Sequence, residues 1–224
     1  MISENHLVAV TIVLLHLSFL ARSSFPVEAS PSNNQSVTFT RITFGSIATD
    51  GGDSSGCAWG DFDGDGYPDL FVGNGGTKNF LYRNNGDGTF AKLMNSAPAS
   101  ISGYGGSWAD YDNDGRLDLF VANLGSNYLY RNNGDGTFTK VTPFAGATGA
   151  NSWSGSWGDY DRDGWIDLFI SNGGGNNNAL LHNNGDGTFT KITVGRIVKD
   201  GGATIGAAWQ DYDGDGWPDL YAAN

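Results

Sequence analysis

The chain has almost none of the residues that build disulfides or cysteine-rich metal centres. Its 224 residues include one cysteine, Cys57, and three histidines, so neither an intrachain disulfide nor a zinc site of Cys and His side chains can be built. Basic residues are also few: 12 Lys and Arg against 24 Asp and Glu give a formal net charge of −12. Nucleic acids and anionic membranes attract clustered Lys and Arg, so this composition argues against both as partners.

Long apolar runs are equally scarce. The run Leu7–Ala21 has 15 residues, which is short for a membrane span and typical of the apolar core of a signal peptide. Val27-Glu28-Ala29 resembles a cleavage site, so we expect a signal peptide over 1–29, a polar linker over 30–36, and a secreted or cell-surface (periplasmic or extracellular) protein. An uncleaved anchor remains an alternative, because the segment MISENH has no Lys or Arg.

What the chain does have is an internal repeat. Four tryptophans are spaced by 49, 49 and 52 residues, and each is followed two residues later by an Asp-rich run of the type DFDGDGYPDLFVGN. A second motif, NNGDGTF, follows the first three of these runs. Repeats of about 50 residues are typical of four-stranded propeller blades. The four tryptophans, which we interpret as blade core, are Trp59, Trp108, Trp157 and Trp209.

The local pattern predicts an all-β fold, a β-propeller of four-stranded blades. One strand ends at the Trp, a second (such as DLFVGN) is apolar on both faces, a third ends in NN, and a fourth (such as TFAKL) alternates after an Asn-Gly-Asp-Gly turn. We expect repeats over 37–224, as an extra strand at 37–44, three full blades and a partial one. The repeat units span about 56–95, 105–143, 154–194 and 206–224.

The Asp-rich runs predict calcium sites. Each run has Asp at positions 1, 3, 5 and 9, Gly at position 6 and a backbone carbonyl at position 7, the arrangement of ligands in an EF-hand loop. It is not an EF-hand, because the flanking segments are strands and position 12 is not Glu. The predicted ligands are the side chains of Asp61, Asp63, Asp65, Asp69, Asp110, Asp112, Asp114, Asp118, Asp159, Asp161, Asp163, Asp167, Asp211, Asp213, Asp215 and Asp219, and the carbonyls of Tyr67, Arg116, Trp165 and Trp217.

Electrostatics supports this prediction. Unit charges about 4 Å apart repel by about 4 kcal/mol per pair at an effective dielectric near 20, so four carboxylates in one loop need a cation or must hold protons. All-oxygen ligands in a flexible loop favour Ca²⁺ over Zn²⁺ or copper, and over the stricter Mg²⁺. Up to four Ca²⁺ ions would reduce the net charge of −12 to −4. Four solvated Asp-rich turns without an ion are the alternative.

The run WGDFDGDGYPDLFVGN followed by NFLYRNNGDGTF resembles FG-GAP or VCBS-type repeats, which are related to the blades of integrin α-subunit propellers. The resemblance covers residues 44–224 and implies structural Ca²⁺ in the loop between the first two strands of a blade. Propellers of this family usually have about seven blades, so we expect this chain to be part of a larger propeller. A small ring closed by residues 37–44, or an oligomer, are the alternatives.

Candidate catalytic residues find little support in the sequence. Gly52-Asp53-Ser54-Ser55-Gly56 matches the G-x-S-x-G string but precedes a blade strand, whereas the hydrolase motif needs a strand–turn–helix elbow and a His base. His182 stands in a third strand where other repeats have Arg83 and Arg131, and we interpret all three as blade-surface residues. We therefore expect no enzyme activity in this chain.

Two functions remain open. The first is an extracellular, calcium-binding propeller that serves as a protein- or glycan-binding adhesion module, with Trp165 and Trp217 as candidate contacts. The second is the non-catalytic propeller portion of a larger secreted enzyme of the polysaccharide lyase or phospholipase type. Neither requires nucleic acid or membrane insertion after signal cleavage, and the sequence identifies no particular extracellular partner.

Overall fold

The computed structural model describes residues 40–199 and 201–224, which form two units divided after Asp50. The first contains the single helical turn α1 (Ser46–Thr49). Residues 41–44, in the expected extra strand over 37–44, form no strand, so that prediction is wrong for this part. The predicted signal peptide and linker lie outside the described residues. No helix within the described residues is long and apolar enough to cross a bilayer.

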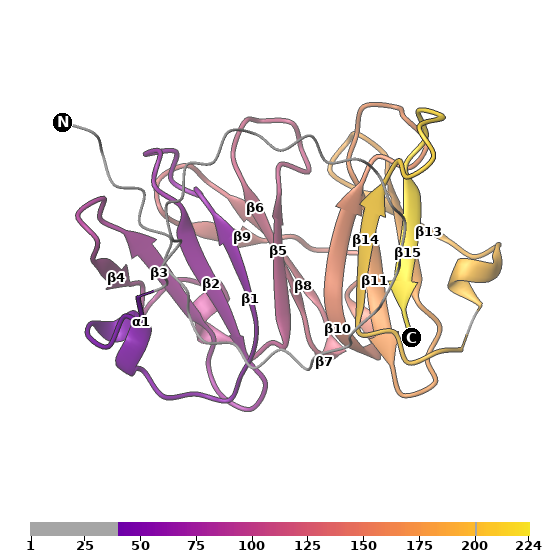
Figure 1. The fold of residues 1–224 in the computed structure, drawn as a ribbon. Coiled ribbons are helices and arrows are strands. Elements are labelled where there is room, and N and C mark those ends of the chain that lie inside the picture. Colours follow the sequence, from indigo (N-terminus) through magenta and orange to yellow (C-terminus); the bar gives the residue numbers. More distant parts are fainter. Residues whose placement is uncertain (1–39, 200) are drawn as a thin grey trace, which may run out of the picture. The chain divides into compact units, whose positions relative to one another are not determined.

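The second unit, Gly51–Asn224, consists of antiparallel sheets that follow one another along the chain (Figure 1). The sheet orders are β1-β2-β3-β4, β5-β6-β8-β9, β13-β12-β11-β10-β7 and β14-β15. Two 3-10 turns, η1 (Pro98–Ser100) and η2 (Arg196–Val198), lie in the connections. The strands are β1 (Ser54–Gly60), β2 (Asp69–Asn74), β3 (Phe80–Asn84), β4 (Phe90–Lys92), β5 (Gly105–Ala109), β6 (Asp118–Ala122), β7 (Leu124–Ser126), β8 (Tyr128–Asn132), β9 (Phe138–Lys140), β10 (Thr148–Gly158), β11 (Asp167–Gly173), β12 (Ala179–Asn183), β13 (Phe189–Ile192), β14 (Gly206–Gln210) and β15 (Asp219–Ala223).

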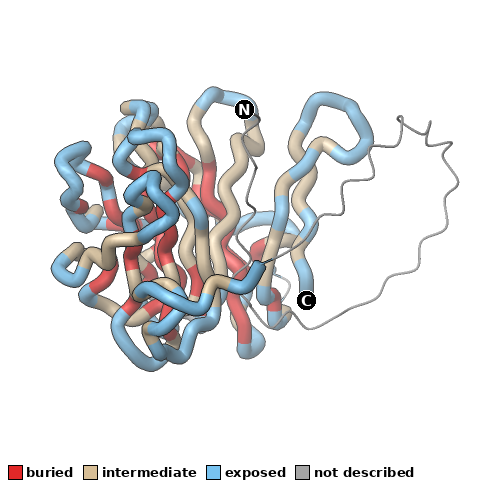
Figure 2. Tube along the Cα trace, turned by 60° about the vertical axis from the view of Figure 1, so that its left-hand side comes forward, coloured by how far each residue is buried: buried red, intermediate tan, exposed pale blue. Residues whose placement is uncertain are grey.

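This arrangement confirms the predicted all-β fold of four-stranded blades. The second strands β2, β6 and β11 are buried almost throughout, as expected of strands covered on both faces (Figure 2). The NNGDGTF turns need glycine because Gly134 and Gly136 have φ of 77° and 82°, a region that other residues rarely adopt. The fourth repeat contributes the two strands β14 and β15 to the described structure, also as predicted.

The sequence pattern did not predict strand β7. β7 pairs with the 11-residue strand β10 of the next repeat, which extends the third sheet to five strands. The register between β10 and β11 shifts between Ser152 and Ser154, a bulge that also occurs between Ser54 and Gly56 of β1. The segment LGS of β7 has no apolar alternation, and for this reason its sequence did not indicate a strand.

Successive sheets pack through their first strands, with β5 against β1 and β10, and β14 against β10. Trp108 stacks on Phe62 of the preceding repeat, with ring centroids 5.8 Å apart, and its Nε1 donates to the Ala58 carbonyl at 3.2 Å. Trp209 Nε1 donates likewise to the Ser156 carbonyl at 3.3 Å. These tryptophans therefore join neighbouring blades. Trp59, in the first repeat, is 44% exposed, so the prediction of a core role is wrong for it.

The first asparagine of NNGDGTF also ties neighbouring repeats together. Asn132 donates through Nδ2 to the Phe62 carbonyl of the preceding acidic loop at 2.6 Å. Asn183 makes the same bond to the Tyr111 carbonyl at 2.8 Å, and both asparagine side chains are buried. Each bond satisfies a buried carbonyl in the loop of one repeat with a side chain of the next, so the loops are held in a fixed relation to their neighbours.

Close approach of the first strands gives a stability prediction. A Cβ on Gly56 would lie 2.6 Å from the carbonyl oxygen of Tyr104, a backbone atom that cannot rotate away. We expect Gly56→Ala to lower the free energy of unfolding by about 1–3 kcal/mol, the usual cost of overpacking. Gly206 occupies the same place in the fourth repeat and has nothing within 4 Å, so Gly206→Ala is the matched control. Equal denaturant midpoints for the two variants would contradict this packing.

Candidate metal centres

Each acidic loop is folded by hydrogen bonds to its own position-1 carboxylate. Asp61 accepts the backbone N–H of Asp65 at 3.1 Å and that of Gly66 at 2.8 Å. The equivalent Gly N–H bonds to Asp110, Asp159 and Asp211 measure 2.8, 3.0 and 2.9 Å. The carboxylate therefore sits inside a curled backbone whose N–H groups point inward, and the same turn recurs in all four repeats.

The position-9 aspartates differ from the rest because they begin the buried second strands. Asp69, Asp118 and Asp167 are 0% exposed. Burial raises the pKa of Asp69 to about 6, although N–H bonds from Asn84 and Phe62 act in the opposite direction. Burial likewise raises the pKa of Asp118 to about 7 and that of Asp167 to about 6. Without a cation, burial therefore disfavours the ionised form of these three carboxyl groups.

The loops bring part of the predicted ligand set together. In each of the four repeats, ligand atoms of three aspartates lie within 4.8 Å of one another. Position 9 belongs to these groups in the first, second and fourth repeats, and position 5 only in the third. The groups are Asp61, Asp63 and Asp69; Asp110, Asp112 and Asp118; Asp159, Asp161 and Asp163; and Asp211, Asp213 and Asp219.

Position 5 accepts the backbone N–H of position 7 in all four repeats, at 2.8–3.0 Å. In the first two repeats an arginine of the third strand also lies beside it. Arg83 Nε lies 2.9 Å from Asp63 and its Nη2 lies 3.9 Å from Asp65. Sequence interpretation placed this arginine on the blade surface and missed the contact. The contact depends on the register between β2 and β3. Tyr82 pairs with Leu70, and this pairing brings Arg83 beside the position-9 aspartate.

The second repeat repeats this arrangement. Arg131 lies 2.6 Å from Asp112 and 3.0 Å from Asp114, and both contacts raise the pKa of the guanidinium. Arg116 of the same loop also contacts Asp114 through Nη2, so two guanidinium groups and four carboxylates leave a formal charge of −2 when all four carboxylates are ionised. Oδ1 of Asp112 is buried and has no hydrogen-bond partner. A buried, unsatisfied carboxylate oxygen in a cluster of this charge is what a hard cation would satisfy.

Position 7 side chains cover the neighbouring hairpin turn. A Cβ on Gly86 would lie 2.7 Å from the Tyr67 ring, and one on Gly185 would lie 2.7 Å from the Trp165 ring. Trp165 is thus partly covered, whereas Trp217 is 51% exposed. The position-7 rings of the first and third repeats therefore pack against a glycine of the NNGDGTF turn. The role of the position-7 carbonyls as Ca²⁺ ligands stays a prediction.

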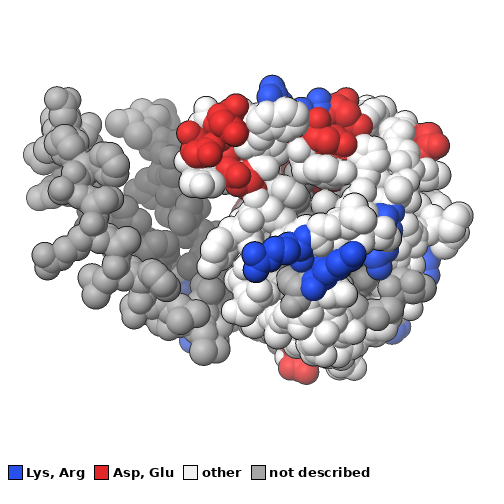
Figure 3. Space-filling model, turned by 90° about the vertical axis from the view of Figure 1, so that its right-hand side faces the viewer, with Lys and Arg blue, Asp and Glu red and all other residues white. Residues whose placement is uncertain are grey.

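The four loops lie in a row. Asn113 Nδ2 of the second loop donates to the Gly164 carbonyl of the third at 3.3 Å. Arg162 of the third loop lies over the Trp217 ring of the fourth, 5.1 Å from its centroid. Figure 3 shows the carboxylates gathered mainly along one edge, with Lys and Arg across the adjoining face. The candidate sites therefore form a series along one edge of the second unit.

The G-x-S-x-G string does not form a nucleophile elbow. Ser54 lies at the start of strand β1 and donates to Asn74 Oδ1 at 2.8 Å, while Ser55 donates to the Tyr104 carbonyl at 2.8 Å. A strand of this kind lacks the sharp strand-to-helix turn that exposes a hydrolase serine. The Ser54 hydroxyl thus bonds within the first blade, and the Ser55 hydroxyl bonds to the segment that precedes strand β5.

The repeated acidic loop, its place between the first two strands and the four-stranded sheets agree with one family. A model described as FG-GAP-like repeat matches residues 61–121, 110–170 and 159–222. The chain belongs to the FG-GAP-like repeat family. Comparison with curated proteins finds no match. As an FG-GAP-like protein it has the architecture of a partial β-propeller, as the sequence predicted.

A solved structure of a lectin from Agrocybe aegerita is similar in fold. Its title describes specific recognition of non-reducing terminal N-acetylglucosamine. The TM-score is 0.53 at 22% sequence identity, and the alignment covers 80% of this FG-GAP-like chain. The chain spans 50% of the length of that lectin. At this identity the similarity concerns the fold.

The raised carboxyl pKa values predict how the stability of the metal-free protein depends on pH. Asp69, Asp118 and Asp167 have folded-state pKa values of about 6, 7 and 6, above the ordinary value of 3.8. The folded state therefore binds more protons than the unfolded state between about pH 4 and 7, and stability falls as pH rises through this window. In chelator, we expect a lower Tm at pH 8 than at pH 5. Saturating Ca²⁺ favours the ionised carboxylates and should remove this fall; a metal-free Tm that rises with pH would contradict the prediction.

Proposed function

We propose that this chain is an extracellular, non-catalytic β-propeller module whose acidic loops bind structural Ca²⁺ and whose loop edge binds a glycan. One observation carries the calcium part: three carboxylates converge within 4.8 Å in every repeat, and in three repeats the converging group includes the position-9 aspartate. The donor set is all oxygen, which suits Ca²⁺.

The residues present fit this ion. Buried carboxylate oxygens without hydrogen-bond partners occur at position 3 of the second and third repeats, on Asp112 and Asp161. Ca²⁺ accepts six to eight oxygen ligands, so it can use such oxygens together with positions 1 and 9. Bound Ca²⁺ would supply positive charge that neutralises the loop. The chain's own contribution is to hold position 1 through Gly N–H bonds and position 9 at the start of a buried strand.

Exposed aromatic rings beside the loops support the glycan part. Trp217 and Tyr67, both at position 7, are 51% and 49% exposed, and Tyr212 in the fourth loop is 79% exposed. Aromatic rings with an apolar face and a polar edge suit the stacking of sugar rings. The fold similarity to a lectin agrees with this proposal. Because these rings lie on the acidic loops themselves, glycan binding should require Ca²⁺.

A glycan array probed with the full chain in Ca²⁺ and in chelator tests the proposal. We expect binding to glycans, terminal N-acetylglucosamine among those tested, that disappears in chelator and is weakened by Trp217→Ala. Tyr221→Ala is the matched control, since Tyr221 is 75% exposed but lies in strand β15 outside the loop. Absence of glycan binding in Ca²⁺, or equal loss in both variants, would refute the glycan part and favour a protein ligand.

A further inference from the structure

The third acidic loop differs from the others in the side chain that faces it. The position beside the buried aspartate holds Arg83 in the first repeat, Arg131 in the second and His182 in the third. Both arginines carry a fixed charge and cannot ligate a metal, whereas a neutral imidazole nitrogen is a common metal ligand. The third site therefore has a nitrogen donor where the first two have a competing cation.

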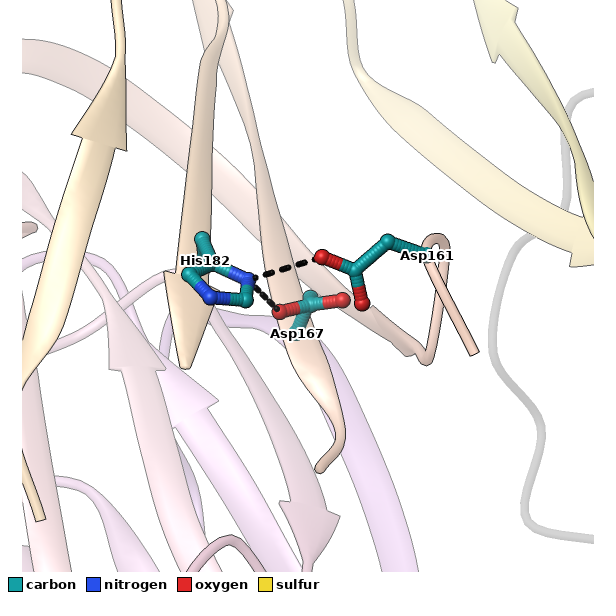
Figure 4. A group of neighbouring side chains, drawn as sticks. All are labelled: Asp161, Asp167 and His182. Atoms are coloured by element: carbon teal, nitrogen blue, oxygen red, sulfur yellow. Dashed lines mark ion pairs between the residues drawn. The ribbon is translucent and has the colours of Figure 1, made fainter. Parts of the chain in front are cut away.

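His182 is placed within ligand distance of two carboxylates from two different elements (Figure 4). Its Nδ1 lies 3.2 Å from Asp161 Oδ2 in the loop and 3.3 Å from Asp167 Oδ1 at the start of β11. A nitrogen and an oxygen ligand of one Zn²⁺ ion, bonded at about 2.0–2.2 Å with angles of 90–109°, lie about 2.8–3.5 Å apart. Both observed distances fall in this range.

Hydrogen bonding leaves these donors available. Nδ1 of His182 is buried and makes no hydrogen bond, although both carboxylate oxygens lie within 3.3 Å of it. Oδ1 of Asp161 is likewise buried and unsatisfied. Asp167 is oriented by N–H bonds from Tyr160 at 3.0 Å and Asn183 at 2.8 Å, the outer-shell support typical of metal ligands.

We propose that the third loop takes a first-row divalent transition metal, with Zn²⁺ as the type ion, through His182 Nδ1, Asp161 and Asp167. Imidazole selects such ions over Ca²⁺, while the all-oxygen sites of the other repeats do not. The scarcity of cysteine and histidine excluded a zinc site made of those residues alone; here carboxylates complete the set. The proposal deepens the cation-binding role proposed for these loops and rests on it.

Titration of the full chain with Zn²⁺, and with Co²⁺ as a spectroscopic probe, in excess Ca²⁺ tests this site. We expect one tight Zn²⁺ per chain and a Co²⁺ ligand-field spectrum that shows nitrogen ligation. His182→Gln removes the nitrogen without adding charge, and His182→Arg installs the residue of the other repeats. Either should weaken Zn²⁺ binding by about 100-fold or more, since loss of an outer-shell partner alone costs 10–100-fold.

Arg131→His provides the gain-of-function control, because it places imidazole at the same position of the second repeat. We expect it to add a second Zn²⁺ and a second Co²⁺ signal. Unchanged Zn²⁺ affinity and Co²⁺ spectrum in both His182 variants, with Ca²⁺ binding and Tm intact, would overturn this inference alone. Absence of Ca²⁺ binding from all loops, with His182-dependent Zn²⁺ binding retained, would instead overturn the proposed calcium role.

Discussion

Chelation of Ca²⁺ should lower the Tm of this protein by more than about 10 °C. Each ion that binds only the folded state adds about 2.7 kcal/mol at 100 times its dissociation constant, and 1 kcal/mol corresponds to about 2–4 °C in a chain of this size. Four loops carry sixteen aspartates, so removal of the ions both withdraws this binding energy and restores carboxylate repulsion. Differential scanning calorimetry in EGTA and in millimolar Ca²⁺ measures the effect.

Mg²⁺ provides the control for this experiment. It demands near-octahedral geometry and gives up its water reluctantly, so it should restore much less of the lost Tm than Ca²⁺ at equal concentration. A Tm that is the same in EGTA and in Ca²⁺ would show that the loops are solvated acidic turns without a structural ion.

Replacement of the buried aspartate of the second repeat should be the most damaging single change in a loop. Asp118 accepts the N–H of Tyr111 at 3.2 Å and of Asn132 at 2.7 Å, and it is 0% exposed. Asp118→Ala leaves two buried donors unsatisfied, at about 1–3 kcal/mol each, so we expect a loss of about 2–6 kcal/mol even in chelator. Urea unfolding of the metal-free protein at pH 5, where the raised pKa of about 7 keeps the Asp118 carboxyl neutral and its replacement relieves no buried charge, measures this loss.

Asp135→Ala is the matched control for Asp118→Ala. Asp135 accepts the N–H of Thr137 at 2.9 Å in the exposed NNGDGTF turn of the same repeat, where water can replace it. Its loss should therefore be much smaller, and Ca²⁺ binding should persist. Equal destabilisation by the two substitutions would mean that burial of position 9 does not decide the stability of the loop.

Much of the fold could be predicted from the sequence because every repeat has the same local residue pattern. A strand such as DLFVGN, apolar on both faces, indicated burial, and β2 is buried almost throughout. Glycines in NNGDGTF indicated positive φ, as found at Gly134 and Gly136. Repetition strengthened every one of these signals. By contrast, β7 occurs only once and has no apolar pattern, so nothing in its residues predicted its pairing with β10.

The sequence predicted the carboxylates of the candidate sites but not the third-strand side chains that face them. Spacing within a loop is local information, so Asp110, Asp112 and Asp118 could be grouped from the sequence. Contacts of Arg131 and His182 depend on cross-strand register, which places the end of the third strand beside position 9. For the same reason the bonds between repeats, such as Asn183 to the Tyr111 carbonyl, appear only once the blades are packed.

Direct counting of bound Ca²⁺ tests the central claim that the acidic loops are cation sites. Isothermal titration of the metal-free chain, free of transition metals, should give four Ca²⁺ per chain. Asp118→Asn, which keeps the shape of the side chain and removes its charge, should give three, with folding verified by circular dichroism. No saturable Ca²⁺ binding to the folded protein, or four ions in the variant at unchanged affinity, would contradict the account.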